Sequence, residues 1–154
     1  MTNLVVLQRL VLSAVLAGVI GYERERHGRA AGFRTHILVG VGSCLTMATA
    51  IYLMDVFAGR VTIDPTRMGS QVISGIGFLG AGTILRFGTS IRGLTTAASL
   101  WVAAGIGLAA GAGFYVGAAA TTGIALVTLF VLGPIEHNIR RASAPNSDAG
   151  QDKA

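Results

Sequence analysis

The amino-acid sequence predicts an all-α, polytopic transmembrane bundle of about five helices. Residues 93–135 include no charged residue, and this run is too long and too apolar for the core of a soluble domain. A bilayer needs about 20 apolar residues per helix, so the run fits two spans. Only 12% of the chain is charged and 52% is hydrophobic, against about 25% charged in a typical soluble domain. The apolar runs do not alternate with polar residues, so helices are favoured over a barrel.

Charged and turn-forming residues divide the apolar sequence into spans. The long uncharged run divides near Gly111 and Gly113, because two glycines favour a turn. The predicted spans cover residues 4–22, 37–54, 68–85, 94–110 and 114–132. We therefore expect one transmembrane domain over residues 1–141, followed by a disordered polar tail over residues 142–154.

The basic residues are distributed unevenly between the two ends of the predicted bundle. One end carries Arg24, Arg26, Arg29, Arg34, Arg86, Arg92, Arg140, Arg141 and Lys153, and the other carries Arg9, Arg60 and Arg67. The positive-inside rule then predicts an outer N-terminus and a cytoplasmic C-terminus. Topology explains the net charge of +5, and no basic helix or stacking platform indicates a nucleic-acid partner.

The 22 glycines of the chain are concentrated in the last three spans. In lipid, small residues let helices approach closely, so one interpretation is a tightly packed bundle or an oligomer interface. The other is a discontinuous third helix that lines a binding site. The candidates for packing or pore lining are Gln71, Gly75, Gly77, Gly80 and Gly82. The G-x-G-x-x-G pattern among them lacks the strand that a dinucleotide site requires.

Residues 23–29 open the first loop at the basic end. Glu25 and Arg29 within them are four residues apart, which supports one more helical turn after the first span. Arg34, Thr35 and His36 then lead into the second span, with Thr35 as its expected N-cap. These side chains suit either topological anchoring or a docking surface for a partner or a phosphate-bearing ligand.

A second polar group precedes the fourth span. Thr95 or Thr96 is expected to cap the backbone amides of that helix. The same amides, together with Arg92, would suit an anion.

The residues of the predicted spans disfavour ion-coupled transport and enzymatic activity. The spans contain no Asp or Glu, which ion-coupled pumps place at mid-depth. Arg9 is expected to reach outward from its span. The histidines lie at predicted membrane edges or in the tail, so none is expected to serve Ser74 or Ser99 as a base. Cys44 is expected to be a small buried thiol. The sequence therefore predicts no enzyme, no cofactor and no metal site.

Four stretches of this chain form a specific combination: Gly21-Tyr22-Glu23-Arg24-Glu25, Ala31-Gly32-Phe33-Arg34-Thr35-His36, residues 74–82 and residues 92–101. In these stretches the chain resembles the MgtC/SapB family of bacterial inner-membrane proteins. Phe33 stands where many members carry leucine. The resemblance implies a five-helix membrane domain, in agreement with the spans above, and this chain is expected to be a short form without the soluble C-terminal domain of longer members.

The resemblance also implies a function. Some members support growth at low Mg²⁺ and survival inside macrophages, so the family is associated with virulence. Its best-known member is described as acting on partner membrane proteins, including the proton-driven ATP synthase, rather than transporting Mg²⁺.

Our first hypothesis is a non-enzymatic inner-membrane modulator of a partner complex in adaptation to low Mg²⁺ or host-like stress. It would contact the bilayer, another integral membrane protein and a possible second copy. The candidate functional face consists of Glu25, Arg34, Thr35, His36, Arg92, Thr95 and Thr96. The alternative is a small oligomeric Mg²⁺ or cation permease, with Asp55, Gln71 and residues 75–82 along the pore. A third possibility is a purely structural packing subunit.

Overall fold

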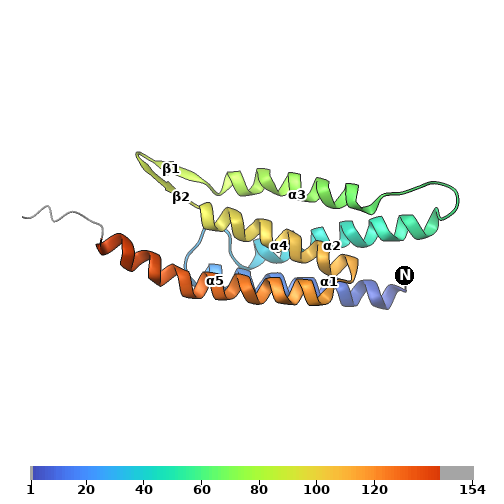
Figure 1. The fold of residues 1–154 in the computed structure, drawn as a ribbon, viewed down its shortest axis with the longest axis horizontal. Helices are drawn as coiled ribbons and strands as arrows, with labels where there is room; N and C mark the ends of the chain where they lie inside the picture. The colour runs from blue at the N-terminus through green and yellow to red at the C-terminus, as the bar shows by residue number, and fades with distance from the viewer. Residues whose placement is uncertain (1, 143–154) are drawn as a thin grey trace, which may run out of the picture.

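The computed structural model describes residues 2–142, and the side chains of residues 2–131. It is a bundle of five helices with one hairpin, which confirms the predicted all-α class (Figure 1). In chain order the elements are α1 (Asn3–Arg26), α2 (Phe33–Val56), α3 (Pro65–Gly82), β1 (Leu85–Phe87), β2 (Ser90–Arg92), α4 (Leu94–Ala112) and α5 (Tyr115–Ala142). Residues 143–154 of the predicted tail lie outside the described residues.

The helices correspond to the predicted spans with shifted ends. Helices α1, α2 and α4 are long and apolar enough to cross a membrane, and α5 is apolar over Tyr115–Val131, the part of this helix whose side chains are described. Helix α3 begins earlier than expected because Asp64 caps its amides, with Pro65 in its first turn. It is one continuous helix, so the interpretation of the third span as a discontinuous helix is wrong.

The hairpin between α3 and α4 is absent from the sequence-based prediction. Strands β1 and β2 pair antiparallel, with Leu85 opposite Arg92, and both are exposed. Gly88 turns the chain with a φ of 59°. Gly93 then returns it to α4 with a φ of 93°, and a Cβ at this position would collide with the carbonyl oxygen of Thr83. Glycine therefore lets the hairpin end directly beside the C-terminus of α3.

The core lies where α1, α2, α4 and α5 meet. Its main buried cluster is Ile20, Cys44, Ile106, Ala110 and Ala118, so the predicted burial of Cys44 is confirmed. Helix α4 crosses α2 through small residues, because a Cβ at Gly107 or Gly111 would collide with the carbonyl oxygen of Gly40 or Cys44. Part of the glycine enrichment thus serves close helix packing, as predicted.

The turn predicted near Gly111 and Gly113 is also confirmed. Helix α4 ends at Ala112, and Gly113 adopts the left-handed conformation with a φ of 87°. Arg9 of α1 donates through Nη1 to the carbonyl oxygen of Gly111 at 2.6 Å and through Nε to the Tyr115 hydroxyl at 3.2 Å. The charge of Arg9 therefore lies at the negative end of the α4 dipole.

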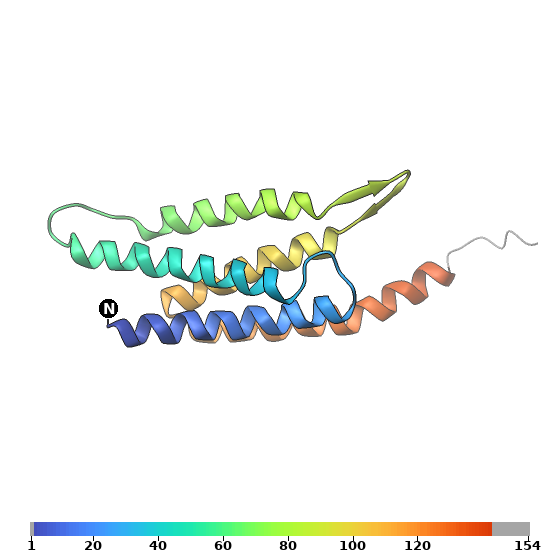
Figure 2. The same cartoon turned by 180° about the vertical axis from the view of Figure 1, so that it is seen from behind.

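The path of the chain brings the two basic segments to one end of the bundle. The loop after α1 and the β hairpin both lie at the end opposite the N-terminus (Figures 1 and 2). The loop between α2 and α3 lies at the other end, near the N-terminus. Arg29, Arg34, Arg86 and Arg92 thus share what we call the basic end, in agreement with the predicted grouping of charges.

Candidate functional site

The seven residues of the predicted functional face lie at the basic end but have two different environments. His36 and Thr96 are buried, at 0% and 3% exposed. The other members are at the surface: Glu25, Arg34, Thr35, Arg92 and Thr95. The structure therefore divides the predicted face into an internal polar cluster and an exposed rim.

Glu25 holds the loop that connects α1 to α2. Its Oε2 accepts a hydrogen bond from the backbone amide of Phe33 at 2.7 Å. Gly32, the residue at the N-cap position of α2, has no side chain to cap that amide. A Cβ at Gly32 would lie 2.7 Å from Glu25 Oε2, so the carboxylate needs the glycine in order to approach. The predicted N-cap role of Thr35 is wrong, because Gly32, three residues earlier, occupies the N-cap position and Thr35 already lies within α2.

His36 connects α2 to α4 inside the bundle. Its Nδ1 lies 2.9 Å from the carbonyl oxygen of Gly32, and its Nε2 lies 3.0 Å from Ser99 Oγ. A carbonyl oxygen only accepts hydrogen bonds, so Nδ1 carries a proton and donates it. The prediction that no histidine reaches Ser99 is therefore wrong. Because α2 begins at Phe33, His36 falls within its first turn and faces α4.

The His36–Ser99 pair has the residue types of a nucleophile and its base but lacks access for a substrate. Ser99 is 5% exposed and His36 is fully buried. The Ser99 hydroxyl also lies 2.8 Å from the carbonyl oxygen of Thr96, which competes for its one proton. The arrangement is suited to joining two helices through hydrogen bonds in a low-dielectric interior.

A buried ion pair beside this cluster was missed by the sequence analysis. Glu23 and Arg24 are each 3% exposed, and Arg24 donates through Nε and Nη2 to the two carboxylate oxygens of Glu23. His27 lies against the same carboxylate, with Nδ1 3.0 Å from Glu23 Oε1. Burying two charges is costly unless they are paired and hydrogen-bonded. Glu23 and Arg24 are adjacent in the sequence, and neighbouring helical residues do not normally face each other. Their spacing therefore did not predict an ion pair.

The polar residues at the start of α4 do not have the roles that the sequence predicted for them. Neither Thr95 nor Thr96 caps the helix, because Gly93 occupies the N-cap position and makes no side-chain bond. The guanidinium of Arg92 lies 5.7 Å from the centre of the Phe87 ring, a cation–π contact within the hairpin. The expected anion site at the helix N-terminus therefore has no support from the position of Arg92.

The candidates on α3 are mostly on its outer side. Gly80 is buried, and a Cβ there would lie 3.5 Å from that of Ala97. A Cβ at Gly75, Gly77 or Gly82 would meet nothing within 4 Å. Gln71 is exposed and lines a cavity near the opposite end of the bundle, together with Thr46, Arg67, Met68, Ser70 and Val72. The structure therefore assigns Gly80 to packing and leaves the other four residues on a surface.

Among the residues that the structure describes, no three His, Cys, Asp or Glu side chains form a group that could hold a metal ion. Asp55 and Asp64 lie on separate segments, Asp55 within α2 and Asp64 at the N-cap of α3.

Comparison with known families gives the chain its classification. The model of the MgtC family matches residues 10–138, which include most of the bundle. The chain belongs to the MgtC family. Membership and the long apolar helices together make it a membrane protein.

Three relatives of this MgtC family member illustrate the range of names. It is 49% identical over 79 residues to YhiD of Escherichia coli (strain K12), whose full name describes a candidate magnesium transporter; the match covers 50% of this chain and 37% of YhiD. It is 42% identical over 83 residues to Protein SapB of Bacillus subtilis (strain 168), and the match covers 53% of this chain and 36% of SapB. It is 44% identical over 72 residues to Protein MgtC of Brucella abortus (strain 2308), and the match covers 47% of this chain and 28% of that protein.

The matched stretches thus span well under half the length of these curated MgtC family relatives. No solved structure matches the chain.

Proposed function

We propose that this chain is a non-enzymatic protein of the bacterial inner membrane that binds and modulates another integral membrane protein. The observation that carries the proposal is an exposed polar face on α3. This face consists of Ser70, Gln71, Ser74 and Gly77, all of them exposed, and we call it the α3 polar face. Helix α3 lies alongside α2 and α4, two helices of membrane-spanning length (Figure 2). We therefore expect lipid or another protein to cover the α3 polar face.

A second helix covers such a face better than lipid does. The Ser70 hydroxyl already donates to the carbonyl oxygen of Arg67. Lipid tails offer no hydrogen bond to the amide of Gln71 or the hydroxyl of Ser74, whereas a polar side chain of a neighbouring helix does. Gly77 would let the two backbones approach closely. Gly107 and Gly111 already serve that purpose inside the bundle, where they face backbone carbonyls of α2. A Cβ at Gly77 would meet nothing within 4 Å, so this position is open for a close contact of that kind.

The exposed rim of the basic end would supply the second part of the contact. Arg34 and Arg92 are exposed there, and positive charge attracts and orients an acidic surface on a partner. Glu25 and His36 would act indirectly, since they hold the loop and α2 in place rather than reaching outward. The setting of low Mg²⁺ or host-like stress belongs to the proposal through the MgtC family resemblance.

Complementation of a deletion strain tests the role of the rim. We expect Arg34→Ala to abolish function while membrane insertion and protein level stay normal. Arg60→Ala removes a positive charge at the opposite end and is the matched control, which should complement fully. If Arg34→Ala complements as well as the unchanged protein, the rim has no part in the contact.

A small oligomeric Mg²⁺ permease is the second candidate. The name of YhiD favours it, as does a cavity of about 540 Å³ that includes Thr46, Ser70 and Gln71. Arg67 lines the same cavity, and its positive charge opposes entry of a cation. We therefore rank transport below partner binding.

Flux measurements separate the two candidates. Purified protein in liposomes would be tested for Mg²⁺ uptake, with a known Mg²⁺ channel as the positive control. Uptake above that of empty liposomes, lost in Gln71→Leu, would establish a permease. Absence of uptake by folded, correctly inserted protein would support the modulator.

A further inference from the structure

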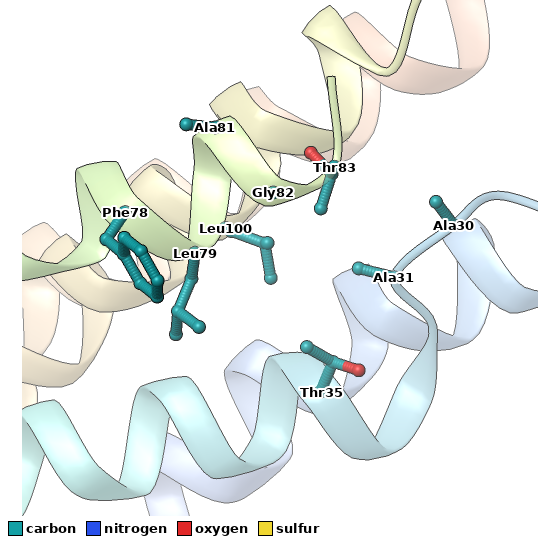
Figure 3. Close-up of a pocket in the computed structure, with 9 residues that line it drawn as sticks. All are labelled: Ala30, Ala31, Thr35, Phe78, Leu79, Ala81, Gly82, Thr83 and Leu100. Carbon is teal, nitrogen blue, oxygen red and sulfur yellow. The ribbon is translucent and has the colours of Figure 1, made fainter. Parts of the chain in front are cut away.

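A groove opens between α2 and α3 at the basic end of the bundle. Its volume is about 420 Å³, and its walls come from the loop after α1, the start of α2, the end of α3 and one residue of α4. Ala31 and Leu100, which are 2% and 1% exposed, are its buried lining residues. Phe78 and Leu79 point from α3 toward α2, the helix that carries Thr35 (Figure 3). These two side chains are 83% and 50% exposed, so the groove is open to its surroundings.

The walls of this groove are almost entirely apolar. Seven of the nine lining residues are Ala, Gly, Leu or Phe, and only Thr35 and Thr83 carry a polar group. The Thr83 hydroxyl is already bonded to the carbonyl oxygen of Gly80 at 2.8 Å. A polar ligand would lose its hydration here without gaining hydrogen bonds in return, whereas a hydrocarbon chain would not.

The size of the groove favours a thin occupant. A helix with its side chains is about 10 Å in diameter, so about 420 Å³ corresponds to a single turn of about 5.4 Å. One turn provides little surface for recognition of a partner helix. A flexible acyl chain can lie along the same space lengthwise.

Two arginines are sequence neighbours of residues that line the groove. Arg29 directly precedes the lining residue Ala30, and Arg34 directly precedes the lining residue Thr35. Both arginines are exposed, and within residues 2–131 neither is held in an ion pair. Glu25, an acid in the last turn of α1, accepts the Phe33 amide. A guanidinium binds a phosphate oxygen pair with matching geometry.

We propose that the groove binds an anionic phospholipid, with an acyl chain between α2 and α3 and the headgroup phosphate at Arg29 and Arg34. The apolar walls recognise the chain, and the two arginines select the negative headgroup. The groove takes Phe78, Leu79, Ala81 and Gly82 from α3, and none of these residues belongs to the α3 polar face.

Native mass spectrometry of the purified full chain tests the proposal, with phosphatidylglycerol and phosphatidylcholine added at equal concentration. Gly82→Leu fills the groove without a backbone collision, because nothing lies within 4 Å of its Cβ. Gly123→Leu is the matched control on α5, where the Cβ is equally unobstructed. Arg29→Gln with Arg34→Gln removes the rim charge, and Arg60→Gln with Arg67→Gln removes two charges from the opposite end.

We expect the unchanged protein to retain phosphatidylglycerol in preference to phosphatidylcholine. Gly82→Leu should lose the retained lipid, and Gly123→Leu should keep it. The Arg29/Arg34 variant should bind phosphatidylglycerol about 25-fold more weakly, since each arginine near an anionic headgroup contributes about fivefold. The Arg60/Arg67 variant should be unchanged.

Three results would overturn the proposal. Equal retention of the two lipids would remove the role of the rim charge. Unchanged retention by Gly82→Leu would place the lipid elsewhere. Loss of a second copy or of another protein, rather than of lipid, in Gly82→Leu would make the groove a protein-binding site.

Discussion

His36 Nε2 lies 3.0 Å from Ser99 Oγ, and this bond joins the first turn of α2 to the first half of α4 inside the bundle. Both side chains are buried. On the other side of the ring, Nδ1 donates to the carbonyl oxygen of Gly32. The imidazole therefore ties the end of the loop after α1, where Glu25 also accepts the Phe33 amide, to the helix that follows the hairpin. The two basic segments of the chain are coupled through this one side chain.

Removing the Ser99 hydroxyl should destabilise the bundle. In Ser99→Ala the His36 ring keeps a buried nitrogen without a partner, which costs about 1–3 kcal/mol. Unfolding in mixed detergent micelles would measure the loss. Ser70→Ala removes an exposed hydroxyl of the same type and should change stability little. Equal losses in the two variants would mean that the His36–Ser99 bond contributes nothing specific.

The α2–α4 crossing should not tolerate a methyl group at Gly107. The new Cβ would collide with the carbonyl oxygen of Gly40, and relieving such overpacking costs about 1–3 kcal/mol. Gly105→Ala on the same helix meets nothing within 4 Å and is the control. Thermal unfolding of both variants would compare them. If Gly107→Ala were as stable as Gly105→Ala, the close approach of α4 to α2 would be incorrect.

Glu25 should control the order of the loop that carries Arg29. Glu25→Ala removes the acceptor of the Phe33 amide and should weaken the start of α2 by about 1 kcal/mol. Hydrogen exchange at Phe33 would then become faster. Glu25→Gln keeps an oxygen acceptor without its charge and should give an intermediate rate. Exchange that is equally slow in all three proteins would show that the carboxylate does not cap α2.

The start of α3 should depend on pH through Asp64. The Thr66 hydroxyl, followed by the Thr66 amide, holds the pKa of this carboxyl below its usual range. A lowered pKa means that the capping is complete above the ordinary value of about 3.9 and is lost as the pH falls through the lower, folded value. The amide signal of Thr66 should therefore titrate with a midpoint below about 3.9. A midpoint at or above that value would contradict the cap, and Asp64→Asn should abolish the titration.

The helices were predictable from the sequence because their signal is local. A long run without charge is sufficient to indicate spanning helices in the second half of the chain, and two glycines mark the turn before α5. The hairpin was not predictable from the same signal. Its residues, such as Leu85 and Arg92, continue the apolar and basic patterns of their neighbours, and only the left-handed Gly88 and Gly93 reverse the chain.

The candidate site was predictable only at the level of which end of the bundle carries it. Arg34 and Arg92 were placed at one end by counting spans, and the structure agrees. The internal contacts depend on the exact start of each helix. A shift of a few residues at the start of α2 turns His36 toward α4, and a carboxylate from α1 replaces the expected Thr35 cap. Contacts between residues that are far apart in the sequence cannot be predicted from the spacing of neighbouring residues.

The central claim is that the α3 polar face contacts another membrane protein, and site-specific photocrosslinking in intact membranes tests it most directly. A photoreactive residue at Ser74 would report on this face, and the same residue at Val15, 55% exposed on α1, would report on lipid-facing surface. We predict a discrete adduct with a different membrane protein from Ser74, absent from Val15 and lost when Gly77→Leu is added. No adduct from Ser74, or the same adducts from both positions, would contradict the claim.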